Sequence, residues 1–197
     1  MTPIARVPWA LIWFRAGAAF LPWICSAFGW PMEVALYAIP LALLSDIFDG
    51  KIARRYGTVT VLLRRADGWA DNAFTLSYTA FVLIARWEVL EPYLGWIIAL
   101  GLFRAARAGL DFWKYGRGSA YHLYAAKAWG LAYYTFLALV LAEGPFDFAM
   151  LAVLVLGFVN TTEGIVATLM TPVWIIDAPH VFAAIKKGRQ AVQNTKL

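Results

Sequence analysis

The stretch from Asp46 to Asp71, DIFDGKIARRYGTVTVLLRRADGWAD, decides the fold of this chain. It holds four aspartates in two pairs: Asp46 and Asp49 lie three residues apart, and Asp67 and Asp71 lie four residues apart. Both spacings place the two carboxylates of a pair on one face of a helix. Four gathered carboxylates repel one another and are costly to desolvate unless hard divalent cations neutralise them. The pattern therefore predicts two helices that meet at a Mg²⁺ site.

Basic residues around the aspartates indicate what the metal serves. Metal ions and guanidinium groups both stabilise the charge of phosphate oxygens, so the stretch predicts chemistry on phosphates. Arg55, Arg64 and Arg65 have a second explanation, because cations that flank a membrane span anchor it without touching a substrate. In chain order the basic residues are Lys51, Arg54, Arg55, Arg64 and Arg65.

The same residues resemble the motif of the CDP-alcohol phosphotransferases, which are integral membrane enzymes. That motif reads D-x-x-D-G-x-x-A-R, then about eight residues, then G-x-x-x-D-x-x-x-D. One position departs, because Leu63 stands where the family has its second glycine. A leucine there adds a branched side chain at a place where helix and nucleotide approach closely in the family. The positions that match at the required spacing are Asp46, Asp49, Gly50, Ala53, Arg54, Asp67 and Asp71.

The resemblance implies a division of roles among the motif residues. All four aspartates are expected to hold two Mg²⁺ ions, with Mn²⁺ as the alternative metal. Asp71 is expected to act as the general base, as a ligand of the second metal, or as both. Binding of the nucleotide diphosphate is expected from Asp49, Gly50, Ala53 and Arg54. Members of the family are commonly homodimers, so a homodimer is expected here too.

Composition places the chain in a membrane. Of its 197 residues 62% are apolar and ten are tryptophans, which is far from the mixture in a soluble domain. No linker or low-complexity run separates the apolar segments, so we expect one domain over 1–197 with a basic, frayed tail from about 180. The net charge of +5 alternates with apolar spans. It therefore favours anionic lipid headgroups and phosphate substrates as partners over nucleic acid.

The apolar pattern predicts an all-α integral membrane protein with six transmembrane helices, preceded by a short interfacial helix over 7–14. About 15 residues of helix are too short to cross a bilayer, so the helix that starts after Pro31 has to continue through Asp46 and Asp49. A short loop is expected at 87–91. The positive-inside rule places both termini and the aspartates on the cytoplasmic side of the inner membrane. The predicted spans are 16–32, 33–49, 67–87, 93–112, 124–141 and 148–170.

Cations outside the motif suggest a second binding region. Arg104, Arg107 and Lys127 lie within predicted spans, where a charge is costly and usually has an anionic partner. That partner is either an acidic side chain, among them the aspartates, Asp111 and Glu163, or a phosphate on the acceptor. The second choice defines an acceptor pocket formed by Arg104, Arg107, Arg117 and Lys127.

These observations lead to one function and three competitors. The leading interpretation is transfer of a phosphatidyl group from CDP-diacylglycerol to a small polar alcohol such as glycerol 3-phosphate, with release of CMP. A CDP-choline or CDP-ethanolamine enzyme acting on a lipid alcohol is the enzymatic alternative. A divalent-cation transporter would also place carboxylates in spans, but nearer the bilayer midplane. Leu63 motivates the last alternative, a catalytically idle relative.

Overall fold

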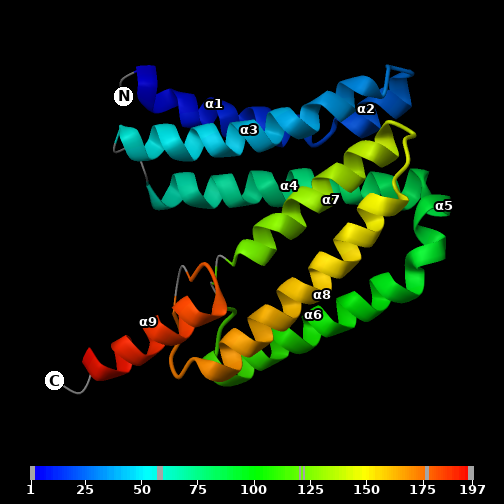
Figure 1. The fold of residues 1–197 in the computed structure, drawn as a ribbon. Coiled ribbons are helices and arrows are strands. Elements are labelled where there is room, and N and C mark those ends of the chain that lie inside the picture. The colour runs from blue at the N-terminus through cyan, green and yellow to red at the C-terminus, as the bar shows by residue number, and fades with distance from the viewer. Residues whose placement is uncertain (1–2, 57–59, 120, 122, 176–177, 195–197) are drawn as a thin grey trace. The chain divides into compact units, whose positions relative to one another are not determined.

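The structure is a computed structural model that describes residues 3–56, 60–119, 121, 123–175 and 178–194. The side chains at 3–5, 49–50, 54, 61 and 64 lie outside that description. The described residues form helices and no strands, which confirms the predicted all-α class. In chain order the elements are α1 (Pro3–Ala18), α2 (Leu21–Phe28), α3 (Glu33–Arg55), α4 (Val61–Ala85), α5 (Trp87–Leu90), the 3₁₀ helix η1 (Glu91–Tyr93), α6 (Leu94–Tyr115), α7 (Tyr124–Leu141), α8 (Asp147–Met170) and α9 (Val181–Asn194) (Figure 1).

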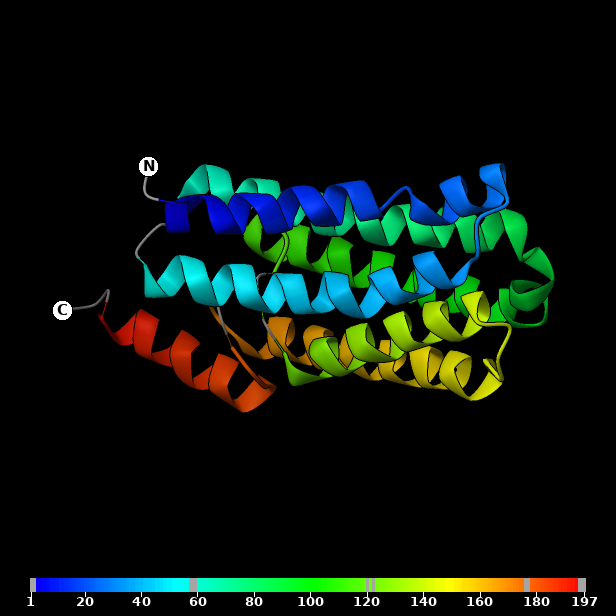
Figure 2. The same cartoon turned by 90° about the horizontal axis from the view of Figure 1, so that it is seen from above.

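The chain divides into two compact units. The first unit contains residues 1–90 and 137–145, and the second contains residues 91–136 and 146–197. In the first unit α1 packs against both α3 and α4, and the three helices run side by side (Figures 1 and 2). In the second unit α6 packs along α8, and α9 packs against α8 (Figure 1).

Small residues form the buried face of α3. The residues on this face recur at intervals of three and four, which is the spacing of one helix face. Alanine and serine side chains let helix backbones approach closely, the usual means of association between helices in a membrane. Asp46 directly follows Ser45 of this face, and Ala53 is a further buried residue near the end of the helix. The members of the face are Ala35, Ala38, Ile39, Ala42 and Ser45.

Larger side chains form the buried face of α4. Thr60 begins the helix by accepting a hydrogen bond from the Leu63 amide at 3.0 Å, which satisfies one of the free donors of the first turn. Tyr78 is fully buried, stacks on Phe74 and donates its hydroxyl to the Ala35 carbonyl at 2.9 Å. The Tyr78 hydroxyl therefore links α4 to the backbone of α3.

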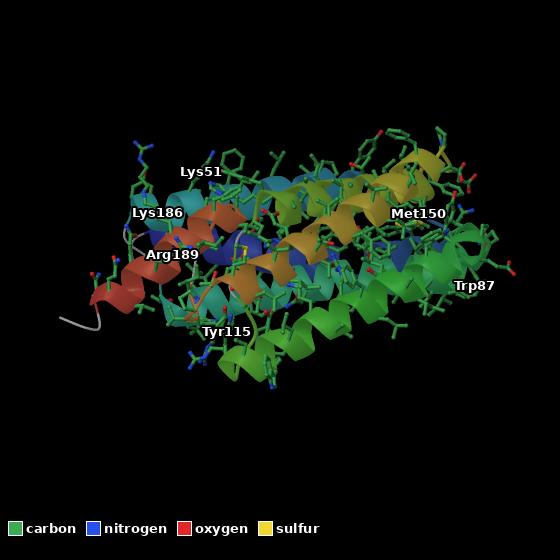
Figure 3. All side chains as sticks on the ribbon, turned by 60° about the horizontal axis from the view of Figure 1, so that its bottom comes forward. Lys51, Trp87, Tyr115, Met150, Lys186 and Arg189 are labelled. Carbon is green, nitrogen blue, oxygen red and sulfur yellow. The ribbon has the colours of Figure 1, made fainter. Side chains whose placement is uncertain are left out.

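In the second unit, side chains at the end of α6 cap the end of α8. Lys114 donates to the Thr168 and Leu169 carbonyls at 2.7 and 3.0 Å. Tyr115, in the last turn of α6 (Figure 3), donates to the Thr168 carbonyl at 3.1 Å. The last carbonyls of a helix have no partner within the helix, and cations near them are favourable. The two helices are therefore joined at this end by polar contacts.

Each of the six predicted spans overlaps a described helix, but fewer helices are long and apolar enough to cross a membrane. Among the described residues, two segments meet that test, Trp87–Tyr115 and Asp147–Met170. A third, Arg6–Ala18 with Leu21–Phe28, qualifies if a pair bent by 42° counts as one span. Both α3 and α4 carry the ionised residues of the aspartate motif, which lower their hydropathy.

One detail of the predicted helices is confirmed and three are wrong. The helix α3 does continue through Asp46, and it ends at Arg55. The N-terminal helix does not stop before Arg15 but runs to Ala18, and the break comes before α2, whose first turn contains Pro22. The segment 87–91 is short helix rather than loop, since α5 and η1 occupy it.

The third difference is the basic tail. The expected frayed segment is the helix α9, which carries Lys186 and Arg189 (Figure 3). Ala184 and Gly188 are its buried residues. A Cβ atom at Gly188 would lie 2.6 Å from Thr171 Cγ2, so only glycine allows this approach. Packing of Gly188 against Thr171, the residue after α8, therefore stabilises a helix in a segment whose basic composition predicts a frayed tail.

Candidate metal and phosphate site

Three of the four predicted ligands lie together in the first unit. One carboxylate oxygen each from Asp46, Asp67 and Asp71 lie within 4.8 Å of one another. Asp46 comes from α3 and the other two from adjacent turns of α4, so the cluster forms where the two helices pack against α1. Asp49, Gly50 and Arg54 also lie on α3, but their side chains are outside the described part of the chain.

A buried arginine from α1 lies at the centre of the cluster. The Arg15 Nη1 atom donates to Asp46 Oδ1 at 3.4 Å, to Asp67 Oδ1 at 3.1 Å and to Asp71 Oδ1. Its Nε atom donates to Ser45 Oγ at 3.3 Å. Arg15 is only 1% exposed, whereas the three carboxylates are partly exposed. One guanidinium therefore compensates three carboxylates that would otherwise repel one another.

Sequence reasoning missed Arg15 as a site residue. The predicted interfacial helix over 7–14 and the predicted span over 16–32 leave it between them, although two signals point to it. Arg15 is the one cation in the apolar run 7–32, and an ionisable residue within such a run is a functional candidate by default. It also follows Pro8 and Ile12 at helical spacing, and both are buried.

A cavity in the second unit brings together half of the predicted acceptor residues. Its volume is about 460 Å³, and Arg104 and Arg107 line it from α6. Trp129 and Gly130 of α7 and Asn160 of α8 are also in its wall. The Arg104 guanidinium lies 3.9 Å above the Trp129 ring, a cation–π contact.

Asp111 is the acidic partner of Arg107. The Arg107 Nε atom lies 3.9 Å from Asp111 Oδ2, and Asp111 is buried. Asp111 also accepts hydrogen bonds from Thr168 Oγ1 and Ser119 Oγ, both at 2.6 Å. These bonds hold a buried carboxylate in place. Arg107 further donates to Ser119 Oγ at 3.3 Å and to the Asn160 carbonyl at 3.4 Å.

The other two predicted acceptor residues lie elsewhere in this unit. The Arg117 guanidinium lies 4.9 Å above the Trp174 ring. Lys127 is exposed, and its Nζ atom lies 5.6 Å from the centre of the Tyr124 ring. The structure therefore brings Arg104 and Arg107 together at the cavity and does not bring Arg117 or Lys127 to them.

Comparison with known proteins agrees with the aspartate motif. The model of the CDP-alcohol phosphatidyltransferase family matches residues 6–178, which extends across both units. The chain belongs to the CDP-alcohol phosphatidyltransferase family. Searches of curated proteins and of solved structures found no match. The family match ends before α9 begins.

The aspartate cluster fits the metal dependence typical of CDP-alcohol phosphatidyltransferases. Its three carboxylates converge on one cationic group, Arg15, so they are already arranged to share positive charge. Carboxylate oxygens are the ligands that Mg²⁺ and Mn²⁺ prefer. Asp46, Asp67 and Asp71 would hold such an ion.

Leu63, the departure from the CDP-alcohol phosphatidyltransferase motif, packs between helices. It is 6% exposed and belongs to a buried cluster with Ile12 of α1, Ala53 of α3 and Ala70 of α4. Ala53, expected at the nucleotide, lies in the same cluster. The branched side chain therefore fills the space where α1, α3 and α4 meet, one turn before Asp67.

Replacing Leu63 by alanine is expected to lower the unfolding free energy by about 2–4 kcal/mol, because a buried leucine leaves a cavity when truncated. Thermal unfolding of the purified protein in detergent measures this. Leu62 is the matched control, since it is the neighbouring leucine and is 66% exposed. Leu62→Ala is expected to change the unfolding free energy by less than about 0.5 kcal/mol. Equal effects of the two variants would contradict the packing of Leu63.

Gly164 allows Arg107 to lie against the backbone of α8. A Cβ atom at this position would overlap the Arg107 guanidinium, with Cζ, Nε and Nη1 as its nearest atoms. Gly164→Ala is therefore expected to displace Arg107 and, for the acceptor pocket that the sequence predicts, to weaken binding of glycerol 3-phosphate about tenfold or more. Gly101→Ala is the control, because Gly101 lies on α6 with no atom near its Cβ position. Calorimetric titration measures both, and unchanged binding to Gly164→Ala would contradict a role for Arg107.

Proposed function

We propose that this protein is a Mg²⁺-dependent membrane transferase that moves a phosphatidyl group from CDP-diacylglycerol to a small polar alcohol and releases CMP. Family membership supports transfer of a phosphatidyl group between a CDP-alcohol and an alcohol. The observation that carries the proposal is the convergence of Asp46, Asp67 and Asp71 on a single cationic group. Transfer of a phosphatidyl group to an alcohol would be a step of phospholipid synthesis.

The motif residues have different roles in the proposed transfer. Bound Mg²⁺ would stabilise the negative charge on the diphosphate oxygens of the donor. Asp46, Asp49 and Asp67 would hold that ion, and Arg54, with Gly50 leaving room beside it, binds the diphosphate. Asp71 accepts the proton of the acceptor hydroxyl as the hydroxyl oxygen attacks the donor phosphorus in line. The bond from phosphorus to the CMP oxygen breaks as the new ester forms, so no side chain serves as nucleophile.

The cavity in the second unit supports a phosphorylated acceptor such as glycerol 3-phosphate. Two guanidinium groups face it, and among the residues that the structure describes Arg107 pairs with a carboxylate there, that of Asp111. Arginine binds phosphate oxygens through paired hydrogen bonds. The volume of about 460 Å³ falls within the range of small-molecule pockets, about 300–1,000 Å³.

We place the protein in the inner membrane with six spans, as a homodimer, with both termini and the aspartates on the cytoplasmic side. The positive-inside rule supports this orientation, because the segments around the aspartates and the tail are basic. Each of the six expected spans overlaps at least one described helix.

The direct test uses purified protein, Mg²⁺ and radiolabelled CDP-diacylglycerol with a panel of alcohols. We expect Mg²⁺-dependent release of CMP together with a phosphatidyl product, greatest with glycerol 3-phosphate. If turnover occurs only with CDP-choline as the donor and diacylglycerol as the acceptor, the protein is instead an enzyme of the CDP-choline type that acts on a lipid alcohol. Absence of CMP release with every alcohol would overturn the proposed activity.

A further inference from the structure

Two buried polar atoms without a protein partner belong to the wall of the cavity. Trp129 Nε1 and Asn160 Oδ1 have no hydrogen-bond partner among the described residues, and both residues line the cavity. Asn160 is 8% exposed. A buried polar group that lacks a partner is costly, and such groups are rare in folded proteins. Two of them at one cavity indicate that a molecule in the cavity supplies the missing partners.

Two glycines of α8, one before and one after Asn160, allow side chains of other helices to lie close to the α8 backbone. Gly157 lies one turn before Asn160, and a Cβ atom there would be 2.6 Å from Leu100 Cδ2 and 3.2 Å from Trp129 Nε1. Gly164 lies one turn after Asn160 and receives the Arg107 guanidinium. The indole and the guanidinium therefore lie against α8 at the glycines that precede and follow Asn160 on one face of the helix.

The remaining contacts hold this arrangement rigid. The Trp129 ring contacts the Arg104 guanidinium at 3.9 Å and stacks on the Tyr133 ring, with ring centres 5.2 Å apart. Arg107 is held by Asp111, Ser119 and the Asn160 backbone carbonyl. Arg107 bonds to the backbone carbonyl of Asn160 and not to its side chain. The Asn160 side chain can therefore be replaced without removing this contact to Arg107.

The chemistry of the four groups defines what fits them. An anion accepts hydrogen bonds from Arg104, Arg107 and the Trp129 indole N–H, but it offers nothing to the Asn160 carbonyl oxygen, which needs a donor. A hydroxyl group supplies a donor and an acceptor at once. A ligand that pairs with all four groups therefore carries both an anionic group and a hydroxyl.

We propose that Asn160 and Trp129 are specificity-determining residues that recognise a hydroxyl of a phosphorylated alcohol whose phosphate binds Arg104 and Arg107. This inference rests on the proposed function, because it assigns the acceptor of that reaction to this cavity. It adds that the protein distinguishes the acceptor from a plain alkyl phosphate by a hydroxyl. A site built to hydrogen-bond a hydroxyl rejects the analogue that lacks it, since the buried groups then stay unpaired.

Calorimetric titration of the full-length protein in detergent tests the proposal with three probes: glycerol 3-phosphate, propyl phosphate and inorganic phosphate. The wild type is expected to bind glycerol 3-phosphate about tenfold or more tightly than propyl phosphate. In Asn160→Leu the preference disappears, while binding of propyl phosphate is retained. Trp129→Phe keeps the ring beneath Arg104, lacks the N–H, and is expected to reduce the preference. A full preference in Asn160→Leu would overturn the proposal.

A second measurement separates recognition from a structural role. Asn160→Leu removes an unpaired buried oxygen, so its melting temperature is expected to equal or exceed that of the wild type. Thr171→Val is the matched control, because Thr171 Oγ1 is also buried without a partner among the described residues but Thr171 is not in the cavity wall. That variant is expected to keep the full preference. A lower melting temperature in Asn160→Leu with the preference intact would assign Asn160 a structural role instead.

The binding titration needs neither donor nor metal, so its outcome is independent of the assay for CMP release. Release of CMP without a hydroxyl preference would overturn this inference and leave the proposed function in place. A hydroxyl preference without release of CMP from any alcohol would overturn the proposed function and leave the cavity as a binding site for hydroxylated phosphates.

Discussion

Asp71→Asn is expected to lower the turnover number about 10²- to 10⁴-fold at saturating Mg²⁺, which is the usual contribution of a general base. The amide keeps the size of the carboxylate but cannot accept the proton of the acceptor hydroxyl. Asp46 and Asp67 remain in the cluster, so metal binding is expected to persist in this variant. The rate of CMP release at several Mg²⁺ concentrations measures the effect.

Asp67→Asn is the comparison that separates a base from a ligand. It loses a carboxylate oxygen of the same cluster, so its activity is expected to fall and then to recover in part as Mg²⁺ is raised. The activity of Asp71→Asn is not expected to recover. If both variants respond alike to added Mg²⁺, Asp71 is a ligand and the base lies elsewhere.

Arg15→Met is expected to destabilise the metal-free protein by about 2–4 kcal/mol. Removing one member of a buried ion pair costs about 3–5 kcal/mol because the partner charge stays uncompensated. The carboxylates here are partly exposed, with side-chain exposures between 34% and 48%, so solvent reduces the cost. Thermal unfolding in EDTA measures the loss, which corresponds to about 5–10 °C for a chain of this size.

Added Mg²⁺ is expected to restore much of the stability of Arg15→Met, because a divalent cation neutralises the same three carboxylates. Arg6→Met is the control, since Arg6 lies on the same helix and is exposed. That variant is expected to unfold like the wild type with or without Mg²⁺. An Arg15→Met protein as stable in EDTA as the wild type would show that Arg15 does not compensate the cluster.

Much of the helical arrangement could be predicted from the sequence because the apolar segments are long and periodic. The predicted span 124–141 coincides with α7, and 148–170 differs from α8 by one residue. The continuation of α3 through Asp46 followed from the length that a bilayer requires. Exceptions arose where tertiary packing outweighs composition, as in α9, which is ordered by Ala184 and Gly188.

The candidate site was less predictable, because side chains distant in sequence complete it. The helical spacing showed that Asp46 and Asp49 share one face and that Asp67 and Asp71 share another, and the cost of gathering unpaired carboxylates predicted a shared metal site. Arg15, however, lies 52 residues from Asp67, and no local pattern predicts their contact. Arg117 and Lys127 are close to Arg107 in sequence, yet only the structure shows that the cavity is completed by Trp129 and Asn160 instead.

The measurement that tests the central claim most directly is a Mn²⁺ titration of the purified protein followed by electron paramagnetic resonance. The wild type is expected to bind Mn²⁺, and Mg²⁺ is expected to displace it. Asp46→Asn and Asp67→Asn are each expected to weaken Mn²⁺ binding at least about tenfold, since even outer partners of a metal site contribute about 10- to 100-fold. Mn²⁺ binding to both variants with the affinity of the wild type would contradict a metal site at the aspartate cluster.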